Sequence, residues 1–390
     1  MSEHSNPPES TNNFDAEFGR NSGSQVQILS KGGTNEYHGS AYWYHQNNDL
    51  GNARDYFVAR DPVTGKPGPV TPIIQNQGGV TFGAPIYKNH TFFFGTWEVD
   101  RTRGAGSSTT ATVLTSAQAA AITDPTTAAI FKSDGSPSAA GATPTSTSAT
   151  LSGSSANSLN ADLWTLRVDQ LLRGGKDTLS VKYGQNPVKQ ISPGLTFVLT
   201  NLPNFGASVT SKAQTITLGY TAVLTNSITN QLRFGFGRSN PNFPANSPFP
   251  LGPTIQIAGF DNFGETFIVP QGRTQNTFQY LDVVSWVKGR HTFKAGADIN
   301  RYQSPNTFDL LGRGLIIFGS VADFQQGNPT FYTQNVGNFT RHDFALDAFW
   351  FVQDDYRLTD TLTLNLGFRL ESSGGVSEGQ NLISNLNPNI

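Results

Sequence analysis

Charged side chains in alternating segments are the residues of this sequence best suited to chemistry. Each lies where polar or small residues alternate with large apolar ones, a pattern that sends successive side chains to opposite faces of a β-strand. The basic members are Arg167, Lys182, Arg233, Lys294 and Arg369, and the acidic ones are Asp169 and Asp298. We expect them to be solvated charges that balance the charge of a neighbouring part of the protein, with direct contact to a bound solute as the alternative.

Catalytic and metal-binding patterns are absent from the sequence. It contains no G-x-S-x-G, P-loop, H-E-x-x-H or EF-hand motif and no cysteine. Asp354 and Asp355 are adjacent carboxylates, but neighbours on a strand face opposite ways, which argues against a shared acid/base role. No zinc-type spacing links the six histidines, His4, His38, His45, His90, His291 and His342. The sequence therefore predicts no enzyme, no cofactor and no metal site.

The composition favours strands and turns. Among 390 residues there are 40 Gly and 28 Phe, whereas charged residues make up only 14% and the net charge is -2. Without a basic run, a nucleic-acid partner is not expected. No apolar run is long enough for a transmembrane helix. The start, MSEHSNPPES, has no export signal, so we expect an exported chain of this sequence to be part of a longer gene product.

Period-2 alternation predicts about eleven strands. In the clearest case Leu362, Leu364, Leu366, Phe368 and Leu370 alternate with polar or small residues. The same pattern fills segments 164–169, 179–184, 215–222, 232–237 and 293–299, and aromatic-rich strands are expected at 38–46, 76–84, 91–99, 276–287 and 343–355.

The links between these strands alternate in length. Short links are expected at 85–90, 172–177, 225–230, 288–290 and 357–360, and long ones at roughly 47–75, 100–161, 185–213, 238–275 and 300–342. A barrel of the bacterial outer membrane has short periplasmic turns and long extracellular loops. The long links are rich in Gly, Pro, Asn, Ser and Thr, so we expect them to bury no core, with at most a short helix in the Ala-rich stretch 116–131.

The first hundred residues resemble the junction between plug and barrel in Oar-like TonB-dependent receptors, which contain a carboxypeptidase-regulatory-like domain. That family has AEYGR-, KSGTN-, FHGS- and NARNFF-like stretches, and the matching residues here are Ala16–Arg20, Lys31–Asn35, Tyr37–Ser40 and Asn52–Phe57. Gly32 replaces the usual Ser. Later stretches of the family follow in order at 76–95, 166–170, 230–238, 286–298 and 353–371.

The resemblance implies an all-β fold, a partial antiparallel transmembrane β-barrel in the bacterial outer membrane. Residues 1–36 would be the C-terminal end of a plug domain, and residues 37–390 the N-terminal half of a 22-stranded barrel. The expected function is uptake of a large or scarce solute, which could be a siderophore, an oligosaccharide or a peptide. Expected partners are outer-membrane lipid and the TonB complex, contacted through N-terminal parts that this sequence lacks.

Two alternatives remain open at this point. A soluble, secreted β-rich binding or adhesion protein would bury its apolar strand faces in a sandwich, whereas a barrel would present them to lipid. A passive porin would lack an N-terminus resembling residues 14–40.

Overall fold

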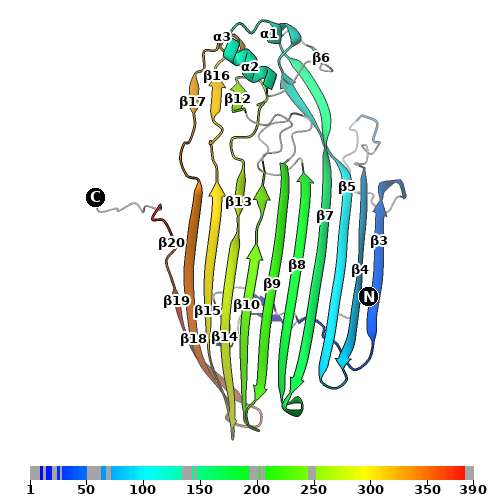
Figure 1. The fold of residues 1–390 in the computed structure, drawn as a ribbon, viewed down its shortest axis with the longest axis vertical. Helices are drawn as coiled ribbons and strands as arrows, with labels where there is room; N and C mark the ends of the chain where they lie inside the picture. Colours follow the sequence, from blue (N-terminus) through cyan, green and yellow to red (C-terminus); the bar gives the residue numbers. More distant parts are fainter. Residues whose placement is uncertain are drawn as a thin grey trace, which may run out of the picture.

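Eleven long antiparallel strands dominate the protein (Figure 1). The computed structural model describes residues 9–11, 15–19, 24–26, 29–50, 63–66, 72–133, 143–144, 147–192, 202, 207–244 and 252–382. The long strands are β3 (His38–Asn47), β4 (Ile73–Tyr87), β5 (Thr91–Val113), β7 (Ala149–Leu172), β8 (Asp177–Ser192), β9 (Ala207–Val223), β10 (Ile228–Ser239), β14 (Gln275–Lys288), β15 (His291–Phe308), β18 (Thr340–Arg357) and β19 (Thr363–Ser373). Each predicted strand coincides with one of them, apart from Leu362, which immediately precedes β19, so the expected all-β antiparallel architecture is confirmed.

Each long strand pairs with the next one along the chain, and β3 and β19 form the edges of the described sheet. The links alternate in length as predicted, with short links at 88–90, 173–176, 224–227, 289–290 and 358–362. All short links gather at one end of the sheet, here called the short-turn end, and the long links gather at the long-loop end (Figure 1). Because the number of strands is odd, β3 and β19 run in the same direction.

Short elements extend this sheet or lie beside it. Strands β11 (Asn242–Phe243) and β13 (Gln271–Arg273) continue β10 and β14, while β6 (Thr143–Pro144) pairs with β7 and β20 (Ser377–Glu378) with β18. Strands β1 (Glu9–Thr11) and β2 (Ser24–Val26) form a separate hairpin, and η1 (Asn48–Leu50) and η2 (Arg173–Gly175) are single 3-10 turns. No described helix is long and apolar enough to span a membrane.

The outer face of the curved sheet is apolar and exposed. On β19, Leu366 and Phe368 are 61% and 65% exposed, and on β10 Leu232 is 51% exposed. All five tryptophans lie in strands at exposed positions, and the rings of Trp97 and Trp164 stack on each other across β5 and β7. A soluble sandwich would require these apolar rows to pack against one another in a buried core, and they do not.

The strands extend further than their alternation indicates. Strand β5 reaches Val113 and β7 begins at Ala149, although 100–161 was expected to be one long link. The expectation was wrong because backbone hydrogen bonds between β5 and β7 continue through Gly-, Ser- and Thr-rich sequence, where side chains do not alternate in polarity. Strand pairing therefore does not require an alternating apolar face.

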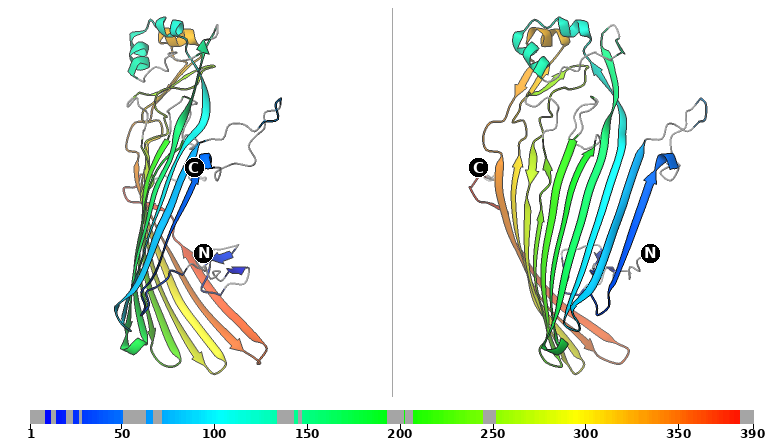
Figure 2. Two further views of the ribbon diagram at one scale, coloured as in Figure 1. Left: turned by 90° about the vertical axis from the view of Figure 1, so that its right-hand side faces the viewer. Right: turned by 45° about the vertical axis from the view of Figure 1, so that its right-hand side comes forward.

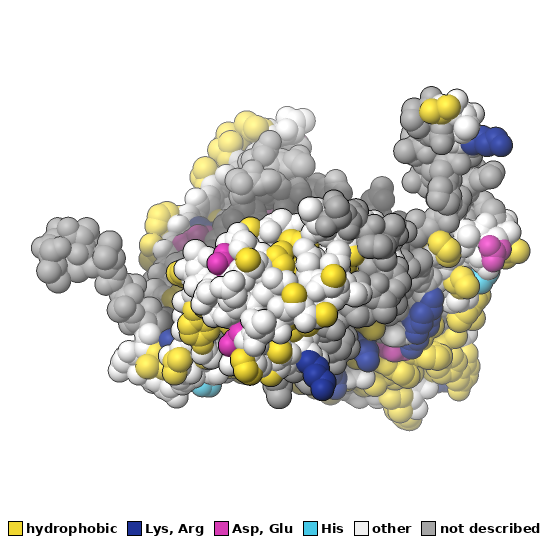
Figure 3. Space-filling model, turned by 90° about the horizontal axis from the view of Figure 1, so that it is seen from above, with side chains coloured by type: hydrophobic (Ala, Val, Ile, Leu, Met, Phe, Trp, Pro, Cys, Tyr) yellow, Lys and Arg dark blue, Asp and Glu magenta, His cyan; other side chains and the backbone are white. Residues whose placement is uncertain are grey.

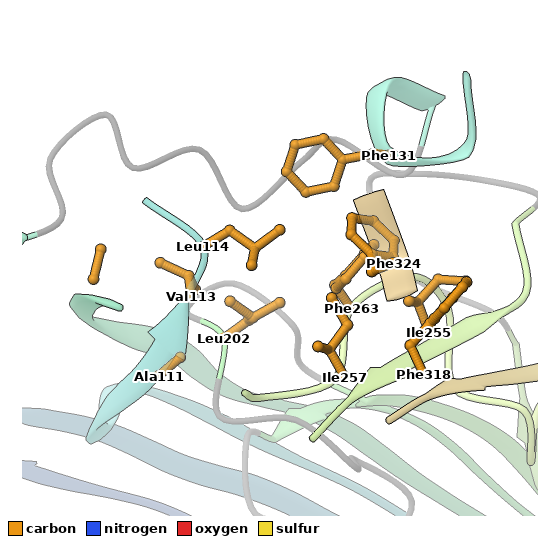
Figure 4. Close-up of a cluster of buried hydrophobic side chains, with 11 residues drawn as sticks. Ala111, Val113, Leu114, Phe131, Leu202, Ile255, Ile257, Phe263, Phe318 and Phe324 are labelled. Atoms are coloured by element: carbon orange, nitrogen blue, oxygen red, sulfur yellow. The ribbon is translucent and has the colours of Figure 1, made fainter. Parts of the chain in front are cut away.

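The long links bury a hydrophobic core, contrary to expectation. This core, with the elements around it, is called the cap (Figure 4). Its buried residues are Ala111, Val113, Leu114, Phe131, Ala149, Leu202, Ile255, Ile257, Phe263, Phe318 and Phe324. They come from four links far apart in the sequence, and no single window shows enough apolar residues to predict a core.

Short helices and a small sheet form the cap. The helices are α1 (Ser116–Ala120), α2 (Pro125–Ser133) and α3 (Val321–Gln326), and a three-stranded sheet contains β12 (Thr254–Ile257), β16 (Leu315–Phe318) and β17 (Phe331–Thr333). Helices α1 and α2 confirm the helical expectation for 116–131. Thr115 and Gln118 form a capping box at the start of α1, and Gln325 Nε2 donates to the carbonyl of Gln118, joining α3 to α1.

Phe324 is fully buried at the centre of the cap, within T-shaped ring contact of Phe131, Phe263 and Phe318. We expect Phe324→Ala to destabilise the cap by about 3–5 kcal/mol, because it removes a ring and leaves a cavity. Hydrogen exchange should accelerate in α1–α3 and β12 and remain slow in the long strands. Phe331→Ala is the control, since Phe331 is 53% exposed. Equal acceleration by both variants would contradict a cooperative cap.

Candidate functional site

The inner face of the sheet holds the N-terminal segment, defined here as the described residues among 9–36, which are 9–11, 15–19, 24–26 and 29–36. Its hairpin of β1 and β2 lies on the inner side of the curve (Figure 2). Contacts with the sheet occur at two places, around residues 15–19 on β15, β18 and β19, and around residues 30–35 on β5 and β7. The segment therefore bridges distant strands.

The first anchor is a row of polar contacts across neighbouring strands. Lys294 on β15 lies opposite Gln353 on β18. Lys294 Nζ donates to Asp15 Oδ2 at 2.8 Å, and the backbone N–H of Ala16 donates to Gln353 Oε1 at 2.7 Å. The hydrogen bond from Lys294 lowers the pKa of the Asp15 carboxyl below its usual value. This row fixes the position of residues 15 and 16.

The first anchor continues onto β19, where the absence of a side chain on Gly367 leaves room for Ala16. Gly367 lies opposite Gln353, and a Cβ added there would be 2.8 Å from Cβ of Ala16. Ala16 also packs against a small buried cluster of Leu281, Val283 and Phe351. The inner face is therefore not wholly polar where the N-terminal segment contacts it.

Arg369 binds the backbone of the same turn. Its Nη1 donates to the carbonyl oxygens of Glu17 at 2.9 Å and of Ala16 at 3.3 Å. Its Nε donates to Glu371 at 2.6 Å, which orients the guanidinium, and the ring of Phe349 lies 4.9 Å from its central carbon. Because Arg369 binds carbonyl groups, it positions the chain without depending on the side chains of that chain.

Arg167 forms the second anchor, on β7. Its Nη1 donates to the carbonyl oxygen of Ser30 at 2.6 Å, while its Nε donates to both carboxylate oxygens of Asp169. Nearby, a Cβ on Gly33 would lie 2.3 Å from the carbonyl oxygen of Phe93. Only glycine permits this approach of the N-terminal segment to β5.

Just before the chain enters β3, two reciprocal hydrogen bonds hold it at the short-turn end. Asn35 Nδ2 donates to Asn89 Oδ1, and the backbone N–H of Asn89 donates to Asn35 Oδ1, both at 2.7 Å. A Cβ on Gly39 would be 2.5 Å from the carbonyl oxygen of Thr81, so glycine allows the first long strand to start close to β4.

The five predicted basic residues thus all lie on the inner face, but they do not all bind the same partner. Arg167, Lys294 and Arg369 bind the N-terminal segment, as described. Lys182 lies opposite Arg167, and Arg233 lies opposite Leu281, which places both on the same face. Neither forms a hydrogen bond with the described residues of the segment. Whether any of the five contacts a solute remains a prediction.

Sequence reasoning missed the partners of these residues. Gln353 sits in a polar position of an alternating strand, which was a usable signal. Asp15 and Ser30 lie in irregular chain, where no periodicity marks them. The matching residues Arg20 and Asn52–Phe57 lie outside the described residues.

A polar cavity of about 300 Å³ opens beside the first anchor. Glu17, Gln231, Ser285 and Lys294 contribute to its lining. No nucleophile is paired with a base there, and within the described ranges no group of three or more His, Asp or Glu could hold a metal ion. The adjacent carboxylates diverge, as expected: Asp354 bonds His291, and Asp355 accepts from Gln353.

The comparison with protein families decides what kind of sheet this is. The profile of a family described as an outer membrane beta barrel domain matches residues 29–390. The chain belongs to this family. Its outer apolar face therefore contacts lipid in the bacterial outer membrane, its short-turn end is periplasmic, and the cap is extracellular.

One solved structure agrees with this fold. The outer membrane transporter YddB from Escherichia coli superposes with a TM-score of 0.55 at 9% identity, covering 95% of this chain and 44% of YddB. At this identity the likeness shows the fold alone, and the chain spans less than half of that transporter. The ferric-catecholate import receptor Fiu from E. coli K12 has a TM-score of 0.30 at 9% identity, covering 78% of this chain and 46% of Fiu, which is too weak to indicate a shared fold. No curated protein matches the chain in sequence.

The Asp15–Lys294 contact predicts a pH dependence. Because the folded protein lowers the pKa of Asp15, the contact is complete above the ordinary carboxyl pKa of about 4 and is lost as the pH falls through the lowered value. Spin labels at positions 18 and 363 of the protein should give a narrow distance distribution at neutral pH that broadens in acid. Asp15→Asn should remove most of this pH dependence, and an unchanged acid response in that variant would contradict the assignment.

Proposed function

We propose that the protein is a TonB-dependent outer-membrane receptor of the Oar-like type, which takes up a large or scarce solute. Residues 1–36 are then the end of a plug domain, and residues 37–390 the first half of its barrel. The observation that supports this best is the N-terminal segment bound to the inner wall by Arg167, Lys294 and Arg369. A segment held inside the wall is what a plugged transporter requires.

The strength of these anchors suits a plug that must move. Side chains of Lys294 and Asp15 are 25% and 37% exposed, so solvent screens their attraction. Ion pairs of this kind contribute about 0–1 kcal/mol each. Several such contacts hold the segment in register at rest, yet a pulling force applied through TonB can break them one after another.

The number and direction of the strands support an incomplete barrel. Because β3 and β19 run the same way, an antiparallel closure needs an odd number of further strands between them. Closure is required since unpaired backbone groups are costly in lipid. The coverage of 44% of YddB is consistent with about half of such a barrel.

The cap is the part of the chain that meets an extracellular solute first. Seen from the long-loop end, its described surface shows hydrophobic and uncharged side chains with scattered charges (Figure 3). This surface does not select among siderophore, oligosaccharide and peptide.

Two experiments test the proposal in cells that make the full-length protein. The triple variant Arg167→Ala, Lys294→Ala, Arg369→Ala should loosen the plug and admit a bulky hydrophilic antibiotic such as vancomycin, at least severalfold more than the wild type. Lys88→Ala, Lys176→Ala, Arg290→Ala is the matched control, since these residues lie in periplasmic turns. Unchanged sensitivity of the anchor variant would contradict a plug, and a permeable wild type would indicate a porin.

The second experiment asks whether uptake needs TonB. Mass spectrometry of a complex growth medium should show a solute that is depleted only when the receptor and TonB are both present. Depletion without TonB would contradict energised transport.

A further inference from the structure

An aspartate lies at the centre of the lipid-facing row of β14. Successive outward side chains on this strand are Phe278, Tyr280, Asp282, Val284 and Trp286, of which Tyr280, Val284 and Trp286 are 49%, 39% and 39% exposed. The alternate residues Leu281 and Val283 are buried on the inner face. A strand crosses the hydrocarbon with about 9–11 residues, so a stretch bounded by aromatic residues at both ends places Asp282 near mid-depth.

The residues paired directly with Asp282 on the two adjacent strands are apolar. Its direct neighbours on β10 and β15 are Leu232 and Ala297. One strand further along the same row lie Tyr220 on β9, opposite Leu232, and Trp350 on β18, opposite Ala297. The carboxylate therefore lies between apolar side chains on a hydrocarbon-facing surface, a placement that costs free energy and suggests a functional site.

The side chain of Asn230 donates a hydrogen bond to this carboxylate but leaves part of its acceptor capacity unused. Asn230 Nδ2 donates to Asp282 Oδ1 at 2.5 Å, and the same nitrogen is 3.3 Å from the carbonyl oxygen of Val283. Both N–H groups of the amide are thereby used. Among the described residues no donor reaches Asp282 Oδ2 and no basic side chain pairs with Asp282, so its remaining acceptor capacity points outward.

We propose that this outward patch, formed by Asp282 and its neighbours Leu232 and Ala297, binds a second membrane-spanning protein that presents a lysine or arginine at the same depth. Charge complementarity selects this partner. The amine of a lipid headgroup lies about 15 Å away at the interface, because the hydrocarbon is about 30 Å thick. A second copy packed about a twofold axis at this patch would bring two Asp282 carboxylates together, and like charges repel in a medium of low dielectric.

The proposal does not depend on the transport mechanism. It requires only that the outer face contacts lipid, which family membership establishes. It therefore stands or fails separately from the plug and from TonB.

A model peptide tests the patch on the full-length protein in lipid nanodiscs. The probe is a membrane-spanning leucine–alanine helix with one central lysine and a fluorescent label, compared with the same helix with a central leucine. We expect the lysine peptide to bind about tenfold more tightly than the leucine peptide, since polar contacts between membrane segments contribute about 1–2 kcal/mol. Energy transfer from the protein's tryptophans to the labelled peptide gives the binding curve.

Three variants make the result specific. Asp282→Asn should abolish the preference for the lysine peptide, while Asp282→Glu should retain it. Asp360→Asn, which removes an exposed carboxylate from a periplasmic turn, should leave it unchanged. Equal binding of the two peptides by the wild type, or a preference that survives Asp282→Asn, would overturn the proposal. So would self-association of the wild type, seen by sedimentation and lost in Asp282→Asn, because the partner would then be a second copy.

Discussion

Hydrocarbon offers no hydrogen bonds to a polypeptide backbone, and this constraint determines the architecture of the protein. Every strand in the lipid must pair with its neighbours, and every outward side chain must tolerate an apolar solvent. The alternation of Leu179, Val181 and Tyr183 with Ser180 and Lys182 meets the second requirement on β8, and the continuous antiparallel pairing from β3 to β19 meets the first. The same alternation that makes one face apolar leaves the other polar, and the N-terminal segment occupies that polar face.

The two faces use different physical interactions. On the outside, exposed leucines and aromatic rings contact lipid, and neighbouring rings such as Trp97 and Trp164 also stack across strands. On the inside, the segment is held by a few directional contacts, of which those of Arg369 to backbone carbonyls are insensitive to the sequence that they bind. Hydrogen bonds and ion pairs fix the position of the segment but can break one at a time, whereas a large apolar interface would have to separate as a whole. Among the described residues, the larger hydrophobic core lies in the cap at the extracellular end, and the inner face holds a small cluster of Leu281, Val283 and Phe351.

The sequence predicted what depends on local periodicity and missed what depends on distant contacts. Strands such as β19 follow from the spacing of Leu362 to Leu370, and the alternation of short and long links gave the orientation of the sheet. The cap was missed because Val113, Ile255 and Phe324 are contributed by separate links. The partners of Arg167 and Lys294 were missed for the same reason, since Ser30 and Asp15 lie in irregular chain more than a hundred residues away. Asp282 could have been found in the sequence, as a charged residue on the apolar phase of an alternating strand.

Site-directed spin labelling of β8 tests the account most directly. Labels placed one at a time at positions 179 to 183 of the full-length protein in bilayers report collisions with oxygen, which concentrates in lipid, and with a water-soluble nickel complex. We predict high oxygen accessibility at 179, 181 and 183 and low oxygen accessibility at 180 and 182, with period 2 along the strand. Low accessibility to both reagents at 179, 181 and 183 would mean that these side chains are buried in protein, and would contradict a lipid-facing sheet.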